Sequence, residues 1–86
     1  MAYRVELKES ASKALAKLPK KERQRVQAKI DALVENPRPP GVKKLEGEGR
    51  QYRIRCGDYR VVYSIEDQVL LVSVAKIGHR GDVYRA

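Results

Sequence analysis

The segment Gln51–Ser64, with the sequence QYRIRCGDYRVVYS, predicts a β-hairpin and fixes how its two strands face each other. Polar and apolar residues alternate through Gln51–Cys56, which is the period of a strand with one buried face. Gly57 and Asp58 follow, and a two-residue connection of this kind joins the strands of a tight hairpin. The turn therefore determines which residues of the second strand lie opposite those of the first.

This register gathers three arginines on one face of the hairpin. Arg55 is expected to pair with Arg60, and Arg53 with Val62, so all three guanidiniums project to the same side. Two arginines directly opposite each other destabilise a sheet. At a separation of roughly 7 Å their repulsion is about 0.6 kcal/mol in water and about 2 kcal/mol at an effective dielectric of ~20. An anion between the guanidiniums removes this repulsion, so the hairpin predicts a phosphate-binding site.

The chain as a whole predicts a single domain, residues 1–86, with an α+β fold in the order β-α-α-β-β-β. Ser10 or Ser12 is the expected N-cap of a short first helix, and Lys20–Glu35 is expected to form a longer amphipathic helix. We expect these helices to form a hairpin packed on one face of a twisted, mainly antiparallel sheet. The expected strands are Tyr3–Leu7, Val42–Leu45, Gln51–Cys56, Tyr59–Ile65 and Gln68–Ile77.

The charge of the chain favours an anionic partner. Nineteen Lys and Arg residues against eleven Asp and Glu residues give a net charge of +8 over 86 residues. Such a bias favours a polyanion or an acidic protein as the partner. A basic surface that serves only solubility is the alternative.

Cysteine usage and apolar patterning bear on the compartment and on cofactors. Cys56 is the single cysteine, so no internal disulfide can form, and its place on the apolar side of its strand predicts core packing. No apolar run approaches the ~18 residues of a membrane helix, and the N-terminus lacks the apolar centre of a signal peptide. We therefore expect a cytoplasmic protein with no membrane partner. No Cys, His and Asp cluster has metal-ligand spacing, so we expect no metal and no other cofactor.

Cations are frequent along the two predicted helices and in the short segment Val42–Leu45. A lysine-rich solvent face is ordinary for an amphipathic helix, and docking onto a phosphate backbone is the functional alternative. The residues predicted to contact RNA or the ribosome are Lys13, Lys17, Lys20, Lys21, Arg23, Arg25, Lys43 and Lys44.

The C-terminal segment carries side chains suited to phosphate chemistry. A turn at Glu66-Asp67 would pair Ser73 with Arg60, so this segment is expected to emerge at the arginine-bearing end of the hairpin. His79, the only histidine, can exchange protons near neutral pH, although an exposed or structural role is the alternative. Together with the three arginines of the hairpin, His79, Arg80 and Tyr84 resemble a ribonuclease site. In such a site arginines hold the phosphate, an acid and a general base move protons, and an aromatic ring stacks on a nucleobase.

Two segments, YRIRCGDYRVVY and GHRGDVY, resemble the RelE branch of the RelE/ParE toxin superfamily, and the resemblance extends over nearly the whole chain. It implies the same β-α-α-β-β-β fold and a cognate antitoxin, RelB-like or similar, with operator DNA contacted only through the toxin–antitoxin complex. It also implies an endoribonuclease that enters the ribosomal A site and cleaves mRNA. The implied reaction is attack of the ribose 2′-hydroxyl on the adjacent phosphate without a metal ion.

The resemblance also implies roles for individual residues. Arg53 and Arg55 stand where other members have catalytic lysines. Arg60 and Arg80 match arginines that bind phosphate and stabilise the leaving group, and Tyr84 matches a tyrosine that stacks or handles a proton. Arginine stays protonated, so it cannot replace a lysine as a general base.

The general base must therefore come from another residue. His79 is the first candidate and Tyr84 the second, whereas Glu46 and Glu48 are expected to be turn residues. The sequence predicts a type II toxin of RelE type that acts as a ribosome-dependent mRNA endonuclease. The alternatives are a ParE-like toxin that binds and inhibits DNA gyrase on the same fold, and a non-catalytic nucleic-acid-binding module.

Overall fold

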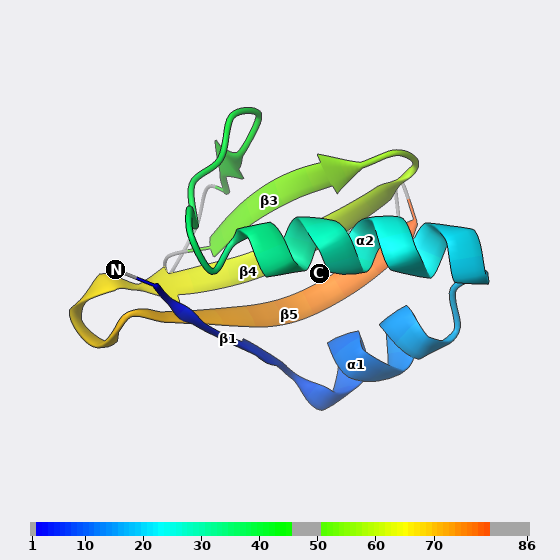
Figure 1. The fold of residues 1–86 in the computed structure, drawn as a ribbon, viewed down its shortest axis with the longest axis horizontal. Coiled ribbons are helices and arrows are strands. Elements are labelled where there is room, and N and C mark those ends of the chain that lie inside the picture. Colours follow the sequence, from blue (N-terminus) through cyan, green and yellow to red (C-terminus); the bar gives the residue numbers. More distant parts are fainter. Residues whose placement is uncertain (1, 46–50, 80–86) are drawn as a thin grey trace.

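Two helices and five strands make up the part of the chain that the structure describes, residues 2–45 and 51–79 of a computed structural model (Figure 1). A short 3₁₀ helix, η1 (Asp67–Val69), precedes the last strand. In chain order the other elements are β1 (Arg4–Leu7), α1 (Glu9–Ala16), α2 (Lys20–Ala32), β2 (Lys43–Lys44), β3 (Gln51–Cys56), β4 (Tyr59–Glu66) and β5 (Leu71–His79).

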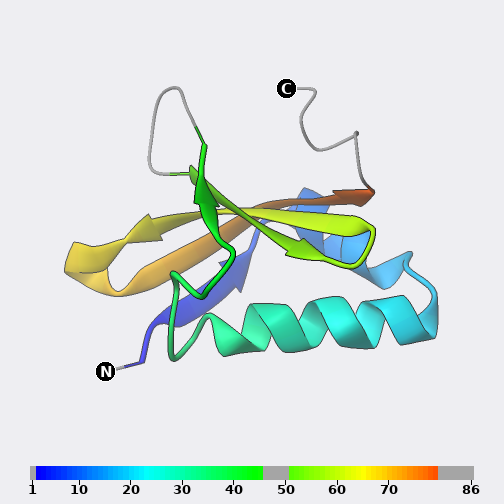
Figure 2. The same cartoon turned by 90° about the horizontal axis from the view of Figure 1, so that it is seen from above.

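The strands form one sheet in the order β1-β5-β4-β3-β2. β1 runs parallel to β5, and every other neighbouring pair is antiparallel. Figure 2 shows α2 lying along one face of this sheet, and Figure 1 shows α1 beside the β1 side of it. The predicted α+β fold, two helices on a mainly antiparallel sheet, is confirmed.

The hydrophobic core lies between the helices and one face of the sheet. Val26, Ile30 and Leu33 from α2 and its C-cap are buried against sheet residues such as Tyr63 and Ile65. Burying one aliphatic side chain of this size stabilises the fold by roughly 1.5–3 kcal/mol. The spacing of these apolar residues therefore fixes which face of α2 meets the sheet.

The start of α1 differs from the prediction that Ser10 or Ser12 caps it. The N-cap is Lys8, and both serines lie within the helix. Lys8 donates its backbone N–H to the carbonyl of Val74 (2.9 Å), so the chain turns into the helix directly after β1. The Ser10 hydroxyl instead donates to the carbonyl of Ala75 (3.3 Å), which ties α1 to β5.

The end of α2 also differs from the prediction, because the helix stops at Ala32 and not at Glu35. The carbonyl of Val34 accepts a hydrogen bond from the backbone N–H of Tyr3 (2.8 Å), so this segment pairs with the chain that enters β1. Pro37 disfavours a helical conformation in the residue before it. Tertiary pairing and proline together explain the earlier end.

The connection between β4 and β5 is longer than the predicted two-residue turn. Glu66 pairs with Leu71, and η1 with Leu70 spans the gap between them. Leu70 adopts the left-handed conformation (φ 51°), which is uncommon for a residue other than glycine. The last strand consequently begins at Leu71, not at Gln68 as predicted.

This connection changes the register of the last strand. Ser73 pairs with Ser64, and Gly78 lies opposite Arg60, so the predicted Ser73–Arg60 pair is wrong. A register shift between Val62 and Tyr63 adds to the difference. The C-terminal end of β5 still lies at the arginine-bearing end of the hairpin, as predicted.

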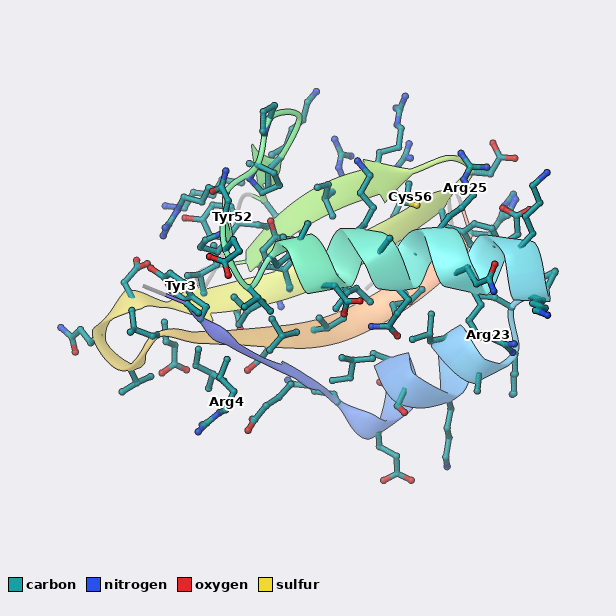
Figure 3. All side chains as sticks on the ribbon, in the orientation of Figure 1. Tyr3, Arg4, Arg23, Arg25, Tyr52 and Cys56 are labelled. Atoms are coloured by element: carbon teal, nitrogen blue, oxygen red, sulfur yellow. The ribbon has the colours of Figure 1, made fainter. Side chains whose placement is uncertain are left out.

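A polar cluster lies at the other end of the sheet, around Arg38 in the segment between α2 and β2. Its Nη2 and Nη1 donate to the two carboxylate oxygens of Asp67 (2.8 and 3.1 Å), and its Nε donates to the hydroxyl of Tyr52 (3.3 Å). The Tyr3 hydroxyl donates to Oδ1 of Asp67 (2.7 Å), which raises the pKa of Tyr3. Figure 3 labels Tyr3 and Tyr52 at this end of the sheet.

Tyr63 holds the segment between α2 and β2 from the side of the hydrophobic core. It is fully buried, its hydroxyl donates to the carbonyl of Pro37 (2.7 Å), and its ring stacks on Tyr52 with centroids 6.0 Å apart. Burial raises the pKa of Tyr63 to about 12. The connection between α2 and β2 is thus held at both the surface and the core.

The predicted turn residues Glu46 and Glu48 lie outside the described residues. Neither α1 nor α2, the helices of the described ranges 2–45 and 51–79, has the length and apolar character needed to cross a membrane.

Candidate phosphate-binding site

The hairpin of β3 and β4 has the predicted register. Arg55 lies opposite Arg60, and Arg53 lies opposite Val62. Gly57 at the turn has a positive φ of 60°, the left-handed conformation that tight hairpin turns require. The local sequence therefore determines the placement of the three arginines on one side of the hairpin.

The three arginines lie on the face of the sheet opposite the helices. Their strand neighbours Ile54 and Val61 belong to the hydrophobic core on the helix side, and side chains alternate along each strand. Arg55 is exposed and Arg53 is half-buried, whereas Arg60 is only 5% exposed. A guanidinium at that depth is held in place by its surroundings, so it presents its charge from a fixed position.

Two lysines extend this arrangement across the sheet. Lys43 of β2 pairs with Arg53, and Lys76 of β5 pairs with Val62, so both project to the same face. We call the resulting set the basic face. Its members are Lys43, Arg53, Arg55, Arg60 and Lys76.

Lys76 was not among the predicted site residues. Strict alternation from the buried Val72 and Val74 places residue 76 on the core side, but the register shift turns it to the opposite face. The buried Ile77 directly after Lys76 breaks the alternation, and this is the signal in the sequence that could have identified it. Bulges of this kind re-aim side chains along a strand.

His79 lies on the other face of the sheet. It pairs with Tyr59, and the two rings meet edge-on with centroids 5.4 Å apart. Tyr59 packs against the hydrophobic core, so this is the helix side of the sheet. The prediction that the His79 side chain arrives beside the three arginines is therefore wrong, because residue 78 and not residue 79 shares their face.

The structure does not bring the predicted helix cations to the basic face. They belong to the helices and the segment between them on the far side of the sheet, where Lys13 pairs with Glu9 (3.0 Å) and Arg25 lies 3.9 Å from Glu22. Lys44 pairs with Tyr52 and so also projects to the helix side. The remaining predicted members of this set are Lys17, Lys20, Lys21 and Arg23, all exposed.

The basic face is hollowed beside Arg55. A hollow of about 330 Å³ is lined by Gly41, Lys43, Arg53 and Arg55. Guanidiniums present planar, forked donors that match phosphate oxygens, and they remain charged at any physiological pH. The arrangement can hold a phosphate and stabilise negative charge that develops on it.

The predicted catalytic residues Arg80 and Tyr84 lie outside the described residues. Within 2–45 and 51–79, no group of three or more His, Cys, Asp or Glu side chains is placed to hold a metal ion. Of the predicted catalytic residues that the structure describes, Arg53, Arg55 and Arg60 lie together on the basic face, and His79 lies on the other face.

Comparisons with known proteins place the chain in one family. Residues 5–84 match the model of the ParE toxin of the type II toxin–antitoxin system parDE. The mRNA interferase toxin RelE of Escherichia coli K12 is 34% identical, over 98% of this chain and 92% of that protein.

Solved structures agree with this placement. A chain of the archaeal RelE–RelB complex of Pyrococcus horikoshii superposes with a TM-score of 0.84 at 39% identity, over 95% of this chain and 99% of that chain. A chain of the intact RelBE complex of E. coli gives a TM-score of 0.78 at 32% identity, over 91% and 96% of the two chains. The chain therefore belongs to the RelE/ParE superfamily of toxins of type II toxin–antitoxin systems.

Proposed function

We propose that this toxin is of RelE type and cleaves mRNA in the A site of translating ribosomes in the cytoplasm. The observation that carries the proposal is the pairing of Arg55 with Arg60 on a face that also bears Lys43, Arg53 and Lys76. Clustered guanidiniums bind a phosphate and stabilise the negative charge that develops on it during cleavage. The likeness to a protein named mRNA interferase supports the same assignment.

The proposed reaction is a transfer of the phosphate ester within the RNA. The 2′-oxygen forms a bond to phosphorus, the bond from phosphorus to the 5′-oxygen of the next nucleotide breaks, and the products are a 2′,3′-cyclic phosphate and a 5′-hydroxyl. A base takes the proton of the 2′-hydroxyl and an acid gives a proton to the 5′-oxygen. Charge that develops on the non-bridging oxygens is stabilised by the guanidiniums of the basic face.

The proton carriers must be other side chains, because arginine does not lose its proton. His79 was the first candidate, but its ring packs against Tyr59 on the opposite face. Tyr84, which lies outside the described residues, becomes the candidate for proton transfer, and Arg80 stays a predicted phosphate-binding residue. In this proposal the arginines hold the phosphate and the C-terminal segment moves the protons.

The proposed partner in the resting cell is a cognate antitoxin. Two of the similar solved structures are complexes named RelE–RelB and RelBE. A net charge of +8 fits an acidic, partly disordered segment that folds on binding. Purification of the natively expressed protein is expected to recover a small acidic partner, and operator DNA is expected to bind only to that complex. Recovery of the protein alone, with no growth defect on expression, contradicts this part of the proposal.

The function is tested by expressing the chain without its partner and mapping mRNA ends. New 5′-hydroxyl ends at A-site codons of ribosome-bound mRNA are the expected result, with none on the same mRNA in the absence of ribosomes. A parallel assay follows DNA supercoiling by gyrase. Inhibited supercoiling with intact mRNA would replace the proposal with the ParE-like alternative, and RNA affinity with neither effect would indicate a binding module.

A further inference from the structure

A second hollow, of about 520 Å³, lies on the other side of Arg55, between α2 and the hairpin. Its cations are Arg25 and Lys29 of α2 and Arg55 of β3, and its floor contains Ala28 and Cys56. Arg25 and Lys29 are four residues apart in a helix, so they project from the same side of α2 with Cβ atoms about 5–6 Å apart. We call this hollow the edge pocket; it is lined by Arg25, Ala28, Lys29, Arg55, Cys56 and Gly57.

Arg25 reaches across the gap from α2 to the hairpin turn. A Cβ atom built on Gly57 would lie 3.7 Å from Nη2 of Arg25, so the guanidinium lies over this glycine. Figure 3 labels Arg25 and Cys56 close together at this end of the molecule. The helix cation and the strand cation Arg55 thus line the same pocket.

The edge pocket borders a strand edge that β2 leaves open. β2 pairs with β3 only at Tyr52 and Arg53, so within the described residues Ile54–Cys56 have no strand neighbour on that side. The carbonyl of Gln51 bonds to Leu45 on this edge, and the pattern repeats every second residue, so the backbone N–H of Arg55 also points outward. A bound group at this edge meets an amide donor as well as three cations.

We propose that the edge pocket is a second phosphate subsite, which holds the phosphate of a neighbouring nucleotide as the RNA strand crosses the open edge of β3. Arg55 lines both hollows, so one strand can lie continuously from the basic face, past Arg55, to Arg25 and Lys29. The lining of the two hollows contains five cations and no Asp or Glu. This inference rests on the proposed function, since it extends the path of the same RNA.

An added β-strand from a protein partner fits this edge less well. Residues along an antiparallel strand alternate between neighbours, so of Ile54–Cys56 only Arg55 offers its amide and carbonyl outward. One residue supplies too few backbone hydrogen bonds to hold a strand. A discrete anion that accepts from the Arg55 amide and from cations matches the edge better.

The test uses binding of the protein, free of any partner, to 2′-O-methyl RNA, which cannot be cleaved. The variant is Arg25→Gln with Lys29→Gln, and the charge-matched control is Arg4→Gln with Lys8→Gln at the opposite edge of the sheet. Fluorescence anisotropy measures the affinity for a dinucleotide and a hexanucleotide between about 50 and 200 mM salt.

The pocket variant is expected to bind the hexanucleotide about 25-fold more weakly, about fivefold for each cation removed. The slope of log K against log salt should fall by about 0.7, which corresponds to one phosphate of a single strand. The dinucleotide, which reaches only the basic face, should bind both variants equally. These three results together support the subsite.

Two results would overturn it. The first is a hexanucleotide salt slope for the pocket variant equal to that of the control. The second is unchanged RNA binding together with weakened binding of the acidic antitoxin, which would assign the pocket to carboxylates of the protein partner. Ribosomal cleavage by the unmodified chain is measured separately. If the chain cleaves mRNA but the pocket variant binds the hexanucleotide as the control does, only the subsite is refuted. If the pocket variant binds the hexanucleotide more weakly but the unmodified chain does not cleave mRNA, only the proposed nuclease activity is refuted.

Discussion

The ring of Tyr59 in β4 meets the ring of His79 in β5 edge-on, with centroids 5.4 Å apart and planes at 88°. This contact lies on the helix side of the sheet. The next pair in the ladder is Arg60 with Gly78, and the side chain of Arg60 projects to the opposite side. The imidazole and the arginines are thus separated by the thickness of the sheet. The side chain of His79 therefore does not share the face of Arg53, Arg55 and Arg60.

His79→Gln is therefore expected to retain cleavage within about threefold of the unmodified protein, because loss of a true acid or base lowers the rate by about 10²–10⁴. Tyr84→Phe, which keeps the ring and removes the hydroxyl, is the companion variant and is expected to lose most activity. Single-turnover cleavage on programmed ribosomes measures both. A loss of several orders of magnitude for His79→Gln, with active Tyr84→Phe, would return the proton-transfer role to the histidine.

Arg55→Ala is expected to separate function from stability. The side chain is exposed and faces Arg60, so its removal relieves repulsion and should change the free energy of unfolding by less than about 0.5 kcal/mol. Cleavage should fall by about 10²–10³, as for loss of one positioned charge at a reacting centre. Urea denaturation and ribosomal cleavage are measured on the same preparations, with Lys8→Ala as control. Normal cleavage by a stable Arg55→Ala variant would remove the basic face from the mechanism.

Substitution of Arg60 is expected to separate function from stability less cleanly, because this side chain is only 5% exposed and its loss also alters packing. Arg60→Lys keeps the charge but loses the forked geometry of the guanidinium. This variant should fold normally and cleave ribosome-bound mRNA poorly. Full activity in Arg60→Lys would show that the site needs a charge at this position but not a guanidinium.

The pairing of Arg38 with Asp67 is expected to stabilise the fold modestly. Both side chains are about half exposed, and pairs of this kind contribute roughly 0.2–1 kcal/mol. A double-mutant cycle of Arg38→Gln and Asp67→Asn should give a coupling in that range, reduced at about 1 M salt because the Debye length falls to about 3 Å. A coupling that does not respond to salt would indicate that the hydrogen-bond geometry, and not the charge, carries the interaction.

Tyr63 is expected to make the fold sensitive to alkaline pH. Burial raises the pKa of its phenol to about 12, whereas the unfolded chain titrates near its ordinary value of about 10. The folded state therefore holds the proton to higher pH, so stability is complete below about pH 10 and decreases by about 2 kcal/mol as pH rises to about 12. Tyr63→Phe should remove this part of the pH dependence while weakening the fold by about 1 kcal/mol through the lost bond to Pro37. An identical stability slope above pH 10 in both proteins would contradict the assignment.

Gly57 is expected to be replaceable by asparagine but not by alanine without loss of stability. Its φ of 60° is left-handed, a conformation that disfavours most side chains by roughly 1–2 kcal/mol and asparagine by less. Space is not limiting, because an added Cβ would meet Arg25 at an ordinary contact distance of 3.7 Å. Thermal unfolding of Gly57→Ala and Gly57→Asn measures the difference. Equal melting temperatures would show that the backbone at the turn relaxes.

The hairpin was predictable because its determinants are local. Alternation in Gln51–Cys56 and the Gly57 turn fix the register, and the pairs Arg55–Arg60 and Arg53–Val62 follow from it. The fold class was predictable for a similar reason, because the spacing of apolar residues in the sequence distinguishes helices from strands.

The last strand was not predictable in the same way. Its register depends on η1, on Leu70 in a left-handed conformation and on a shift beside Tyr63, and none of these has a glycine or proline to mark it. Each residue of shift exchanges the two faces of a strand, which is why Lys76 joins the basic face and His79 leaves it.

The sheet joins the first strand of the chain to the last. In the described residues β1 has β5 as its strand neighbour, and β5 lies between β1 and β4. A nascent chain that has emerged only as far as residue 70 thus has the hairpin and the helices but cannot complete the sheet. Contacts between distant parts of a chain also form slowly. The first strand therefore waits for residues 71–79 before it has a partner, so β1 and β5, the two strands that are farthest apart in the sequence, complete the sheet together.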